Sequence, residues 1–377
     1  MKAIVAWRML VHEKGRSALA LGGILIAILL MFLQLGFYLA VPRGGLLFYD
    51  AMRFDLMLTS SAYVSQGQSS SFPRRRLIQA LAVPEVVGAN AVYQASGRWL
   101  NPEGKLVRDV FVFGFSPSES LFDIPEVEQQ IPLIRQPDVI LIDTASRPEF
   151  GRLDVGRQIE IEHRNVTIGG RYSLGVGFVG LGVALTGDLN FVRMFPNQGG
   201  LSDINLGLLT LRAGAKVDDV VDRLRAVLPE DTRVFTRAEL NEFEVKHWII
   251  STSVGLVFGF GAIIAFIVGL VILNQTLTSQ ITRQMPQYAT LKAMGYTHRE
   301  LALIILALAL IMSTVSFIPA VGLAVVNYWI VREATQLPIE MTWLRLFGVL
   351  AVVWTMSAVS ALLALRVLRR ADPVELF

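Results

Sequence analysis

The chain has 377 residues, of which 53% are hydrophobic and 17% are charged, and its formal net charge is +3. Soluble domains of ordinary composition carry about 25% charged residues, so this balance excludes a purely soluble protein. The sequence contains no cysteine, which excludes disulfides and thiolate metal sites.

Four stretches of the sequence contain no Asp, Glu, Lys or Arg: residues 17–42, 247–282, 301–331 and 346–365. A bilayer core about 30 Å thick is crossed by about 20 apolar residues in a helix, so each stretch is long enough to span it. A secretory signal peptide is the competing interpretation of the first stretch, but its apolar part would have only about 7–15 residues. We therefore predict transmembrane helices at 17–42, 247–273, 301–331 and 346–365.

The distribution of basic residues gives the expected orientation. Segments 1–16, 274–300 and 366–377 carry an excess of Lys and Arg, whereas the short loop 332–345 has equal numbers of basic and acidic residues. Positively charged flanking segments stay in the cytoplasm, so these three segments are expected inside the cell. Residues 43–246 are then expected outside the cytoplasm.

This external region contains 22 Lys and Arg against 25 Asp and Glu. The basic excess of the chain therefore lies beside the membrane, where topology explains it, and no nucleic-acid partner is indicated. Segment 1–16 is predicted to form an amphipathic helix on the cytoplasmic surface, because Ile4, Trp7, Leu10 and Val11 share one helical face.

The external region has two predicted β-α-β modules. The first has a strand at 54–60, a helix at 73–82 with Pro73 in its first turn, and a strand at 88–98. The second has a strand at 205–212, an amphipathic helix at 216–228 and a strand at 232–235. Short strands punctuated by glycines are expected between them at 138–171. The predicted fold is an α-helical membrane protein with four transmembrane helices and a large extracytoplasmic α/β domain inserted between the first two.

A helix is predicted to begin after Thr236, because Thr236 and Glu239 match a capping box. No Pro or Gly follows until Gly255, so one continuous helix from Arg237 to about Leu273 would join the external domain rigidly to the membrane. The alternative is an ordinary linker with a break near residues 246–248.

Small residues recur along the second transmembrane stretch. Rows of small residues let helix backbones approach closely within a membrane. They predict helix packing, either within the chain or across a homodimer axis, through Gly255, Gly259, Gly261, Ala265 and Gly269.

The cytoplasmic loop encodes a short helix that begins near Pro286 and ends at Gly295 as a C′ glycine. Thr297 and Glu300 then match a second capping box at the start of the third transmembrane stretch. The short helix is predicted either to dock a soluble partner or to rest on lipid headgroups. Its candidate contact residues are Tyr288, Leu291, Lys292 and Met294.

An apolar segment at 172–187 contains a G-x-G-x-x-G match at residues 175–180. No acidic residue follows about 20 positions later, so we discount dinucleotide binding. As a hypothesis, lipid-like cargo or an adaptor protein contacts this segment through Val176, Phe178, Val179 and Leu181.

Two absences from the sequence limit the mechanism. There is no G-x-x-x-x-G-K-[ST] motif, so the chain has no phosphate-binding loop of its own. The four predicted helices contain no charged residue, which disfavours an ion pump or a proton-coupled transporter.

Three features together carry a family resemblance: the block 287–295, the single predicted span before a large external domain, and the tail 371–376. They resemble the FtsX-like permeases of MacB-type ABC transporters. Within that group, the amino-acid sequence of the block is most similar to that of DevC-type permeases of cyanobacterial heterocyst glycolipid exporters. The resemblance implies that 43–246 is a MacB-like periplasmic core. It also implies that the short helix is a coupling helix seated in a partner ATPase dimer, through Tyr288, Leu291, Lys292, Met294 and Gly295.

The resemblance further implies a non-catalytic permease subunit of a MacB/DevBCA-type exporter in the inner (cytoplasmic) membrane, with its large domain in the periplasm. This chain would bind no cofactor, and ATP and Mg would belong to the separate ATPase. A homodimer, a periplasmic membrane-fusion adaptor and an outer-membrane TolC-like duct would complete a tripartite efflux assembly for a lipid-like substrate, with glycolipid as the expected cargo. The alternative is an FtsX-type mechanotransmission subunit that regulates an extracytoplasmic cell-wall hydrolase.

Overall fold

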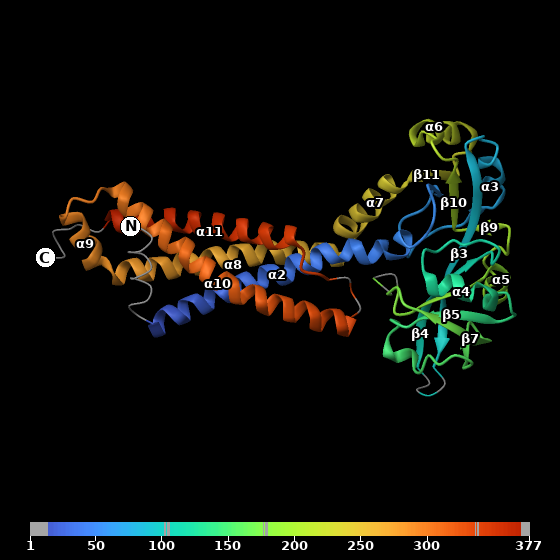
Figure 1. Ribbon diagram of the computed structural model, residues 1–377, viewed down its shortest axis with the longest axis horizontal. Helices are drawn as coiled ribbons and strands as arrows, with labels where there is room; N and C mark the ends of the chain where they lie inside the picture. Colours follow the sequence, from blue (N-terminus) through green and yellow to red (C-terminus); the bar gives the residue numbers. More distant parts are fainter. Residues whose placement is uncertain are drawn as a thin grey trace. The chain divides into compact units, whose positions relative to one another are not determined.

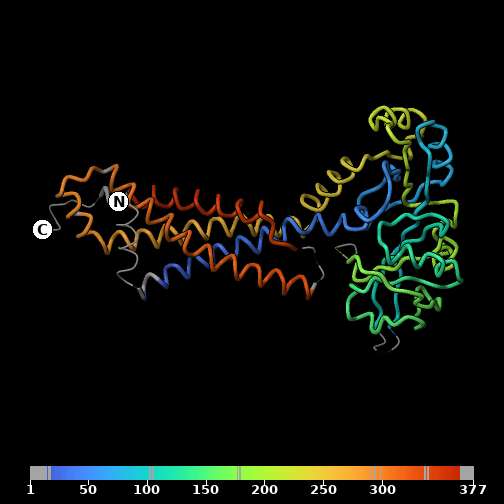
Figure 2. Tube along the Cα trace, in the orientation of Figure 1, coloured from blue at the N-terminus to red at the C-terminus, as the bar shows by residue number. Residues whose placement is uncertain are grey.

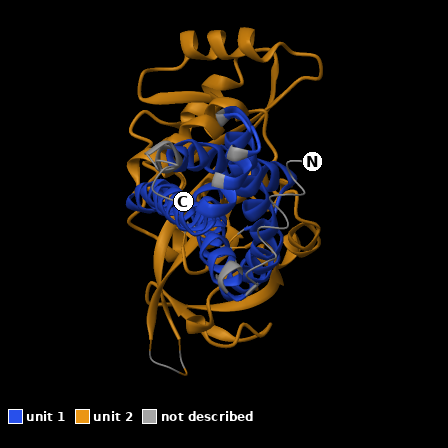
Figure 3. Ribbon diagram, turned by 90° about the vertical axis from the view of Figure 1, so that its left-hand side faces the viewer, with its two compact units in different colours: residues 1–39, 253–334, 339–377 blue, residues 40–252, 335–338 orange. Residues whose placement is uncertain are grey.

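A computed structural model describes residues 14–101, 103, 106–175, 177, 180–335, 337 and 339–370 of the chain. The chain divides into two compact units, coloured separately in Figure 3. The membrane unit comprises residues 1–39, 253–334 and 339–377, and the external unit comprises 40–252 and 335–338. Most of the predicted N-terminal amphipathic helix lies outside the described residues.

Four helices in the described part of the chain are long and apolar enough to cross a membrane. They are α2 (Lys14–Asp50), α8 (Ser253–Arg283), α10 (His298–Thr335) and α11 (Trp343–Arg370), with the short α9 (Met285–Ala293) between α8 and α10 (Figures 1 and 2). The apolar span in α8 begins at Ser253, where we expected 247, and continues to Arg283, where we expected 273.

The small residues of α8 pack within the chain. A β-carbon on Gly259 would lie 3.3 Å from the Tyr38 ring of α2, and one on Gly269 would lie 2.6 Å from Met356 of α11. Gly261 faces Gln34, while Gly255 and Ala265 are buried. Gly259, Gly261 and Gly269 thus contact helices of the same chain, and packing across a homodimer axis stays a prediction.

The expected continuous helix from 237 to 273 is interrupted. Helix α7 (Arg237–Lys246) leads into a π-helical turn η2 (His247–Ser251), and Thr252 then adopts extended backbone angles, with φ −97° and ψ 146°. The predicted capping box of α7 is confirmed, since the Thr236 side chain accepts the Glu239 amide and Glu239 accepts the Thr236 amide. The open alternative, a break near 246–248, is closer to the observed structure.

The external unit is built on one nine-stranded sheet in the order β11-β1-β10-β3-β4-β8-β5-β7-β6, with a separate pair β2-β9. The strands are β1 (Leu56–Ser60), β2 (Phe72–Pro73), β3 (Val86–Leu100), β4 (Val107–Phe115), β5 (Val139–Asp143), β6 (Gln158–Ile161), β7 (Arg164–Tyr172), β8 (Val183–Gly187), β9 (Asp203–Ile204), β10 (Leu206–Leu211) and β11 (Thr232–Thr236). The remaining helices are α3 (Arg75–Ala80), α4 (Pro125–Ile134), α5 (Asp188–Met194), α6 (Val217–Val227) and the 3₁₀ turn η1 (Pro148–Phe150).

The two predicted β-α-β modules are present, and they interleave. The modules β1-α3-β3 and β10-α6-β11 contribute the antiparallel order β11-β1-β10-β3, which is the split β-α-β arrangement. Apolar residues of α3 and α6, such as Leu77 and Leu224, join the core on one face of these strands. Pro73, expected in the first turn of the first helix, lies instead in β2.

The second half of the sheet closes on itself. The long strand β3 pairs with β4, the order continues through β8, β5 and β7 to β6, and β6 returns to β3 at Trp99 and Leu100. Strand β5, with the sequence VILID, is buried at every residue because both of its faces are covered: Ile140 and Ile142 join one core cluster, and Leu141 joins the other.

An aromatic cluster fills the other face of the core. The C-terminal part of α2 contributes Phe48, whose ring lies 5.1 Å from that of Phe113 on β4. The ring of Phe122 lies 5.3 Å from Phe115, also on β4. The last turns of α2 therefore belong to the external core.

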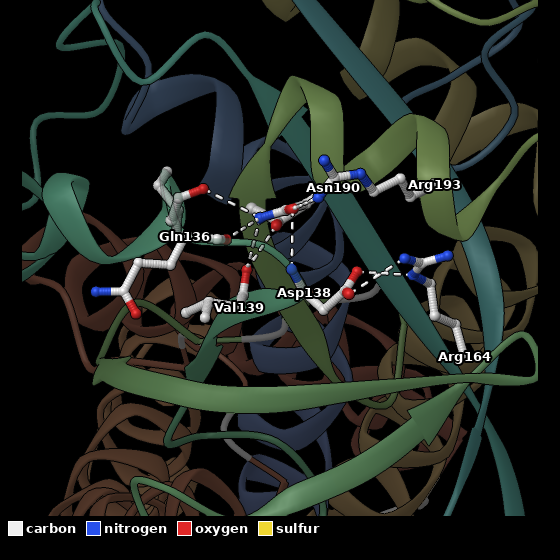
Figure 4. A network of polar contacts seen from close by, with 8 residues as sticks. Gln136, Asp138, Val139, Arg164, Asn190 and Arg193 are labelled. Atoms are coloured by element: carbon white, nitrogen blue, oxygen red, sulfur yellow. Dashed lines mark hydrogen bonds and ion pairs between the residues drawn. The ribbon is translucent and has the colours of Figure 1, made fainter.

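A polar network fixes the turn between α4 and β5 (Figure 4). Asp138 has a positive φ of 58° and is held by Arg164, whose Nε and Nη2 donate to its two carboxylate oxygens at 2.7 and 3.1 Å. Asn190 of α5 accepts the Asp138 amide at 3.0 Å and donates to the Gln136 carbonyl at 2.8 Å. The Arg164 guanidinium lowers the pKa of the Asp138 carboxyl, so the network stays charged at neutral pH.

Candidate coupling site

The candidate site is α9 together with the corner that leads into α10. Helix α8 ends at Arg283, and Gln284 leaves the helical conformation with φ −93° and ψ 13° before α9 begins at Met285. Pro286 occupies the first turn of α9, where its missing N–H removes no helical hydrogen bond. This restart separates α9 from α8.

The end of α9 is a complete Schellman motif. The Tyr296 amide donates to the Leu291 carbonyl at 3.2 Å, and the Gly295 amide donates to the Lys292 carbonyl at 3.0 Å. Gly295 has φ +91°, a backbone conformation that is unfavourable for residues with a β-carbon. The predicted role of Gly295 as a C′ glycine is thus confirmed.

The start of α10 completes the corner. The Thr297 amide donates to Glu300 Oε2 at 3.0 Å, and the Thr297 hydroxyl donates to the same oxygen at 3.1 Å. In a full capping box the Glu300 amide would donate to the Thr297 hydroxyl. Here it donates to the Thr297 carbonyl instead, at 3.0 Å. Both ends of the corner are therefore fixed by local hydrogen bonds.

The five predicted site residues divide between a packed face and an accessible face. Tyr288 is only 1% exposed, whereas Met294 is 64% exposed. Leu291 is half-buried, and Lys292 and Gly295 are exposed. A contact between these residues and an ATPase stays a prediction, and in the single chain Lys292 and Met294 are the accessible side chains of the set.

Tyr288 is an unusual buried residue. Its hydroxyl has no hydrogen-bond partner within the described ranges, and burial raises its pKa to about 12. The side chain therefore stays neutral and anchors α9 by packing. Gln284, one turn earlier, is also buried.

The sequence analysis missed part of the accessible face. Gln287 and Thr290 are exposed and precede Met294 at helical spacing, so these three residues share a face. Half-buried Leu291, four residues after Gln287, borders this face, and buried Tyr288 lies away from it. The helical spacing of the three exposed residues is visible in the sequence, but Gln287 and Thr290 carry no apolar side chain that would indicate a docking surface. Lys292 is the single charged residue between 284 and 297, so the surface is neutral to basic.

The second candidate site, in the apolar segment 172–187, is described only in part. Val176, Phe178 and Val179 lie outside the described residues, whereas Leu181 is described and 39% exposed. The segment connects β7 to β8, two strands, and so lacks the strand-to-helix context of a dinucleotide-binding loop. Across the described ranges, no three His, Asp or Glu side chains gather to hold a metal ion.

Fold and site together define a class: a membrane protein with four long apolar helices and a large α/β domain between the first and the second. Residues 249–373 of the chain match the family of FtsX-like permease C-terminal domains. The match includes α9 and its corner. No curated protein has significant sequence similarity to this chain.

Several solved structures show similarity to about half of this chain, including the following three. The periplasmic region of MacB from Actinobacillus actinomycetemcomitans is 8% identical with a TM-score of 0.36, and the alignment covers 53% of this chain and 94% of that one. The extracellular domain of the noncanonic ABC-type transporter YknZ from Gram-positive bacteria is 12% identical with a TM-score of 0.34, covering 48% and 99%. A domain of a putative permease protein from Porphyromonas gingivalis is 13% identical with a TM-score of 0.31, covering 48% and 85%. Similarity at this level carries no conclusion on function.

Proposed function

We propose that this chain is the permease subunit of an ABC transporter of the MacB/FtsX type, energised by ATP hydrolysis on a separate ATPase. The observation that carries the proposal is the match of residues 249–373 to FtsX-like permease C-terminal domains, because α9 lies inside the matched region. A short helix with one exposed face and two fixed ends suits the docking of a soluble partner.

The mechanism we propose is mechanical. Closure of an ATPase dimer that holds ATP and Mg pushes on the exposed face formed by Gln287, Thr290 and Met294. Buried Tyr288 resists independent rotation of α9, so the push passes to α8 and α10 on either side. In the chain, α8 directly follows α7 and η2, which belong to the external unit. The permease itself does no chemistry on the cargo.

The finer parts of the proposal rest on the resemblance of the block 287–295 and the tail 371–376 to FtsX-like permeases of MacB-type transporters, and of the block to DevC-type permeases. They are a homodimeric permease in the inner membrane with its α/β domain in the periplasm, a membrane-fusion adaptor, a TolC-like duct and a glycolipid as cargo. The exposed apolar residues of α8, among them Phe260 and Ile263, are available for lipid or for a second copy.

The test is co-purification of an ABC ATPase with the full chain from native membranes. Met294→Asp and Leu291→Asp are expected to abolish recovery of the ATPase, because each places a carboxylate on the docking helix. Ile78→Asp, at a 71% exposed apolar position of α3 in the external unit, is the matched control and should leave recovery unchanged. Equal recovery with Met294→Asp and Ile78→Asp would contradict α9 as the coupling element.

The same preparation separates transport from signalling. Reconstituted complex that moves labelled glycolipid in an ATP-dependent manner supports export. Complex that moves no lipid but stimulates a cell-wall hydrolase would replace export with the FtsX-type regulatory role.

A further inference from the structure

A groove of about 420 Å³ lies between α10 and α11, near the ends of these helices that adjoin α9 and the C-terminal tail. This volume falls within the range of about 300–1,000 Å³ of small-molecule sites in proteins. Apart from one arginine, the described residues that line the groove are Ala and Leu.

Two facing helical stripes form the groove. Ala302, Leu303 and Leu306 lie on α10 at helical spacing, and Ala358, Leu362 and Leu365 lie on α11 at the same spacing. The alanines leave room between the helices, while Leu303 and Leu362 are 48% and 66% exposed and form the outer walls. Further along both helices, Trp354 Nε1 donates to Thr314 Oγ1 at 3.2 Å and joins α10 to α11.

Arg299 lines the end of the groove in the first turn of α10. It is exposed, and within the described ranges it has no ion pair or hydrogen bond from its side chain. On the other wall, the sequence after Leu365 continues with Arg366, Arg369 and Arg370. The distribution of basic residues places this end of both helices at the cytoplasmic headgroups.

We infer that this groove binds one anionic glycerophospholipid of the cytoplasmic leaflet, with an acyl chain between α10 and α11 and the phosphate at Arg299. Acyl chains surround any apolar surface in the membrane, and a cation at headgroup depth favours anionic over neutral lipids. A helix of a second copy would cover the apolar walls equally well, but only an anionic headgroup also complements the positive charge of Arg299 at the end of the groove. This inference does not depend on the proposed transport role.

The test uses the full chain purified in a neutral detergent and supplied with phosphatidylglycerol or phosphatidylcholine of identical acyl chains. Native mass spectrometry of the wild-type protein should show one retained lipid per chain, with about fivefold preference for phosphatidylglycerol. Arg299→Gln should abolish the preference while some lipid of both kinds is retained. Arg283→Gln removes a positive charge at the same end of α8, outside the groove, and should keep the preference.

A second variant tests the acyl-chain half of the site. Ala358→Phe fills the groove and should lower the retention of both lipids several-fold, with the thermal unfolding midpoint used to verify that the variant folds. The inference is overturned if Arg299→Gln keeps the wild-type preference. It is also overturned if Ala358→Phe leaves lipid retention unchanged and instead converts dimers to monomers, since a second copy would then occupy the groove.

Discussion

At the scale of single residues, the carboxyl group of Glu244 on α7 is the most informative. It is fully buried, and its Oε1 accepts the Tyr63 hydroxyl and, at 3.0 Å, the Gln66 amide. The Tyr63 hydroxyl in turn lies 2.5 Å from that of Tyr49 near the end of α2. Burial raises the pKa of Glu244 from 4.5 to about 7, because lost solvation disfavours the charged form.

Replacing Glu244 with Gln is expected to remove a pH dependence of stability. The folded protein holds the proton up to about pH 7, whereas the unfolded chain loses it near 4.5, so wild-type stability falls as the pH rises between these values. The decrease amounts to at most roughly 3 kcal/mol above pH 7. The thermal unfolding midpoint of Glu244→Gln should therefore rise relative to wild type between about pH 5 and about pH 8.

Glu242→Gln is the control, because Glu242 is exposed on the same helix. Its pH profile should follow the wild type. Parallel profiles for Glu244→Gln and wild type would show that the buried carboxyl does not titrate in this range.

At the scale of elements, the corner between α9 and α10 depends on one backbone conformation. The Schellman bonds from Tyr296 and Gly295 require the positive φ of Gly295, and the capping contacts of Thr297 follow directly. A rigid corner transmits a displacement of α9 to α10 with little loss, which the proposed mechanism requires.

Gly295→Ala should weaken this corner, because a side chain at positive φ costs roughly 1–2 kcal/mol. The expected result is a lower thermal unfolding midpoint of the full chain together with weaker recovery of the ATPase. Gly322→Ala is the matched control in α10, where a β-carbon would meet no atom within 4 Å and alanine favours the helix. If the two variants behave alike, the corner conformation does not matter for stability.

At the scale of the whole molecule, the orientation of the two units across the membrane can be tested directly, because the chain lacks cysteine. Ser70 in the external unit and Thr290 on α9 are both exposed, so each can be replaced singly by Cys. In intact spheroplasts, a membrane-impermeant maleimide should label Ser70→Cys at once and Thr290→Cys only after permeabilisation. Labelling of both sites without permeabilisation would overturn the topology.

Local patterns account for what the sequence could predict. Uncharged runs locate the four long helices, and alternation with turn residues locates β1, β3, β10 and β11. The interleaving of the two modules and the return of β6 to Trp99 depend on pairing between distant segments, which no local pattern encodes.

The candidate site divides in the same way. Pro286 and Gly295 indicated the ends of α9 correctly, and Thr297 indicated the start of α10, because capping is local. The burial of Tyr288 could not be predicted, since an apolar residue on a short helix suits packing and docking equally. Glu244 looks like an ordinary charged residue of a polar helix, and its environment comes from Tyr63, 181 positions away.

The pairing of β6 with β3 also affects which strand edges of this domain are free to pair with a strand of another protein. Because β6 pairs with β3 at Trp99 and Leu100, β11 is the one strand of the described nine-stranded sheet that has a neighbouring strand on one side only. There the Arg225 guanidinium already donates to the Val234 carbonyl at 3.4 Å. We therefore expect strand addition to this sheet to occur at the five residues of β11, where the Arg225 side chain already occupies one carbonyl.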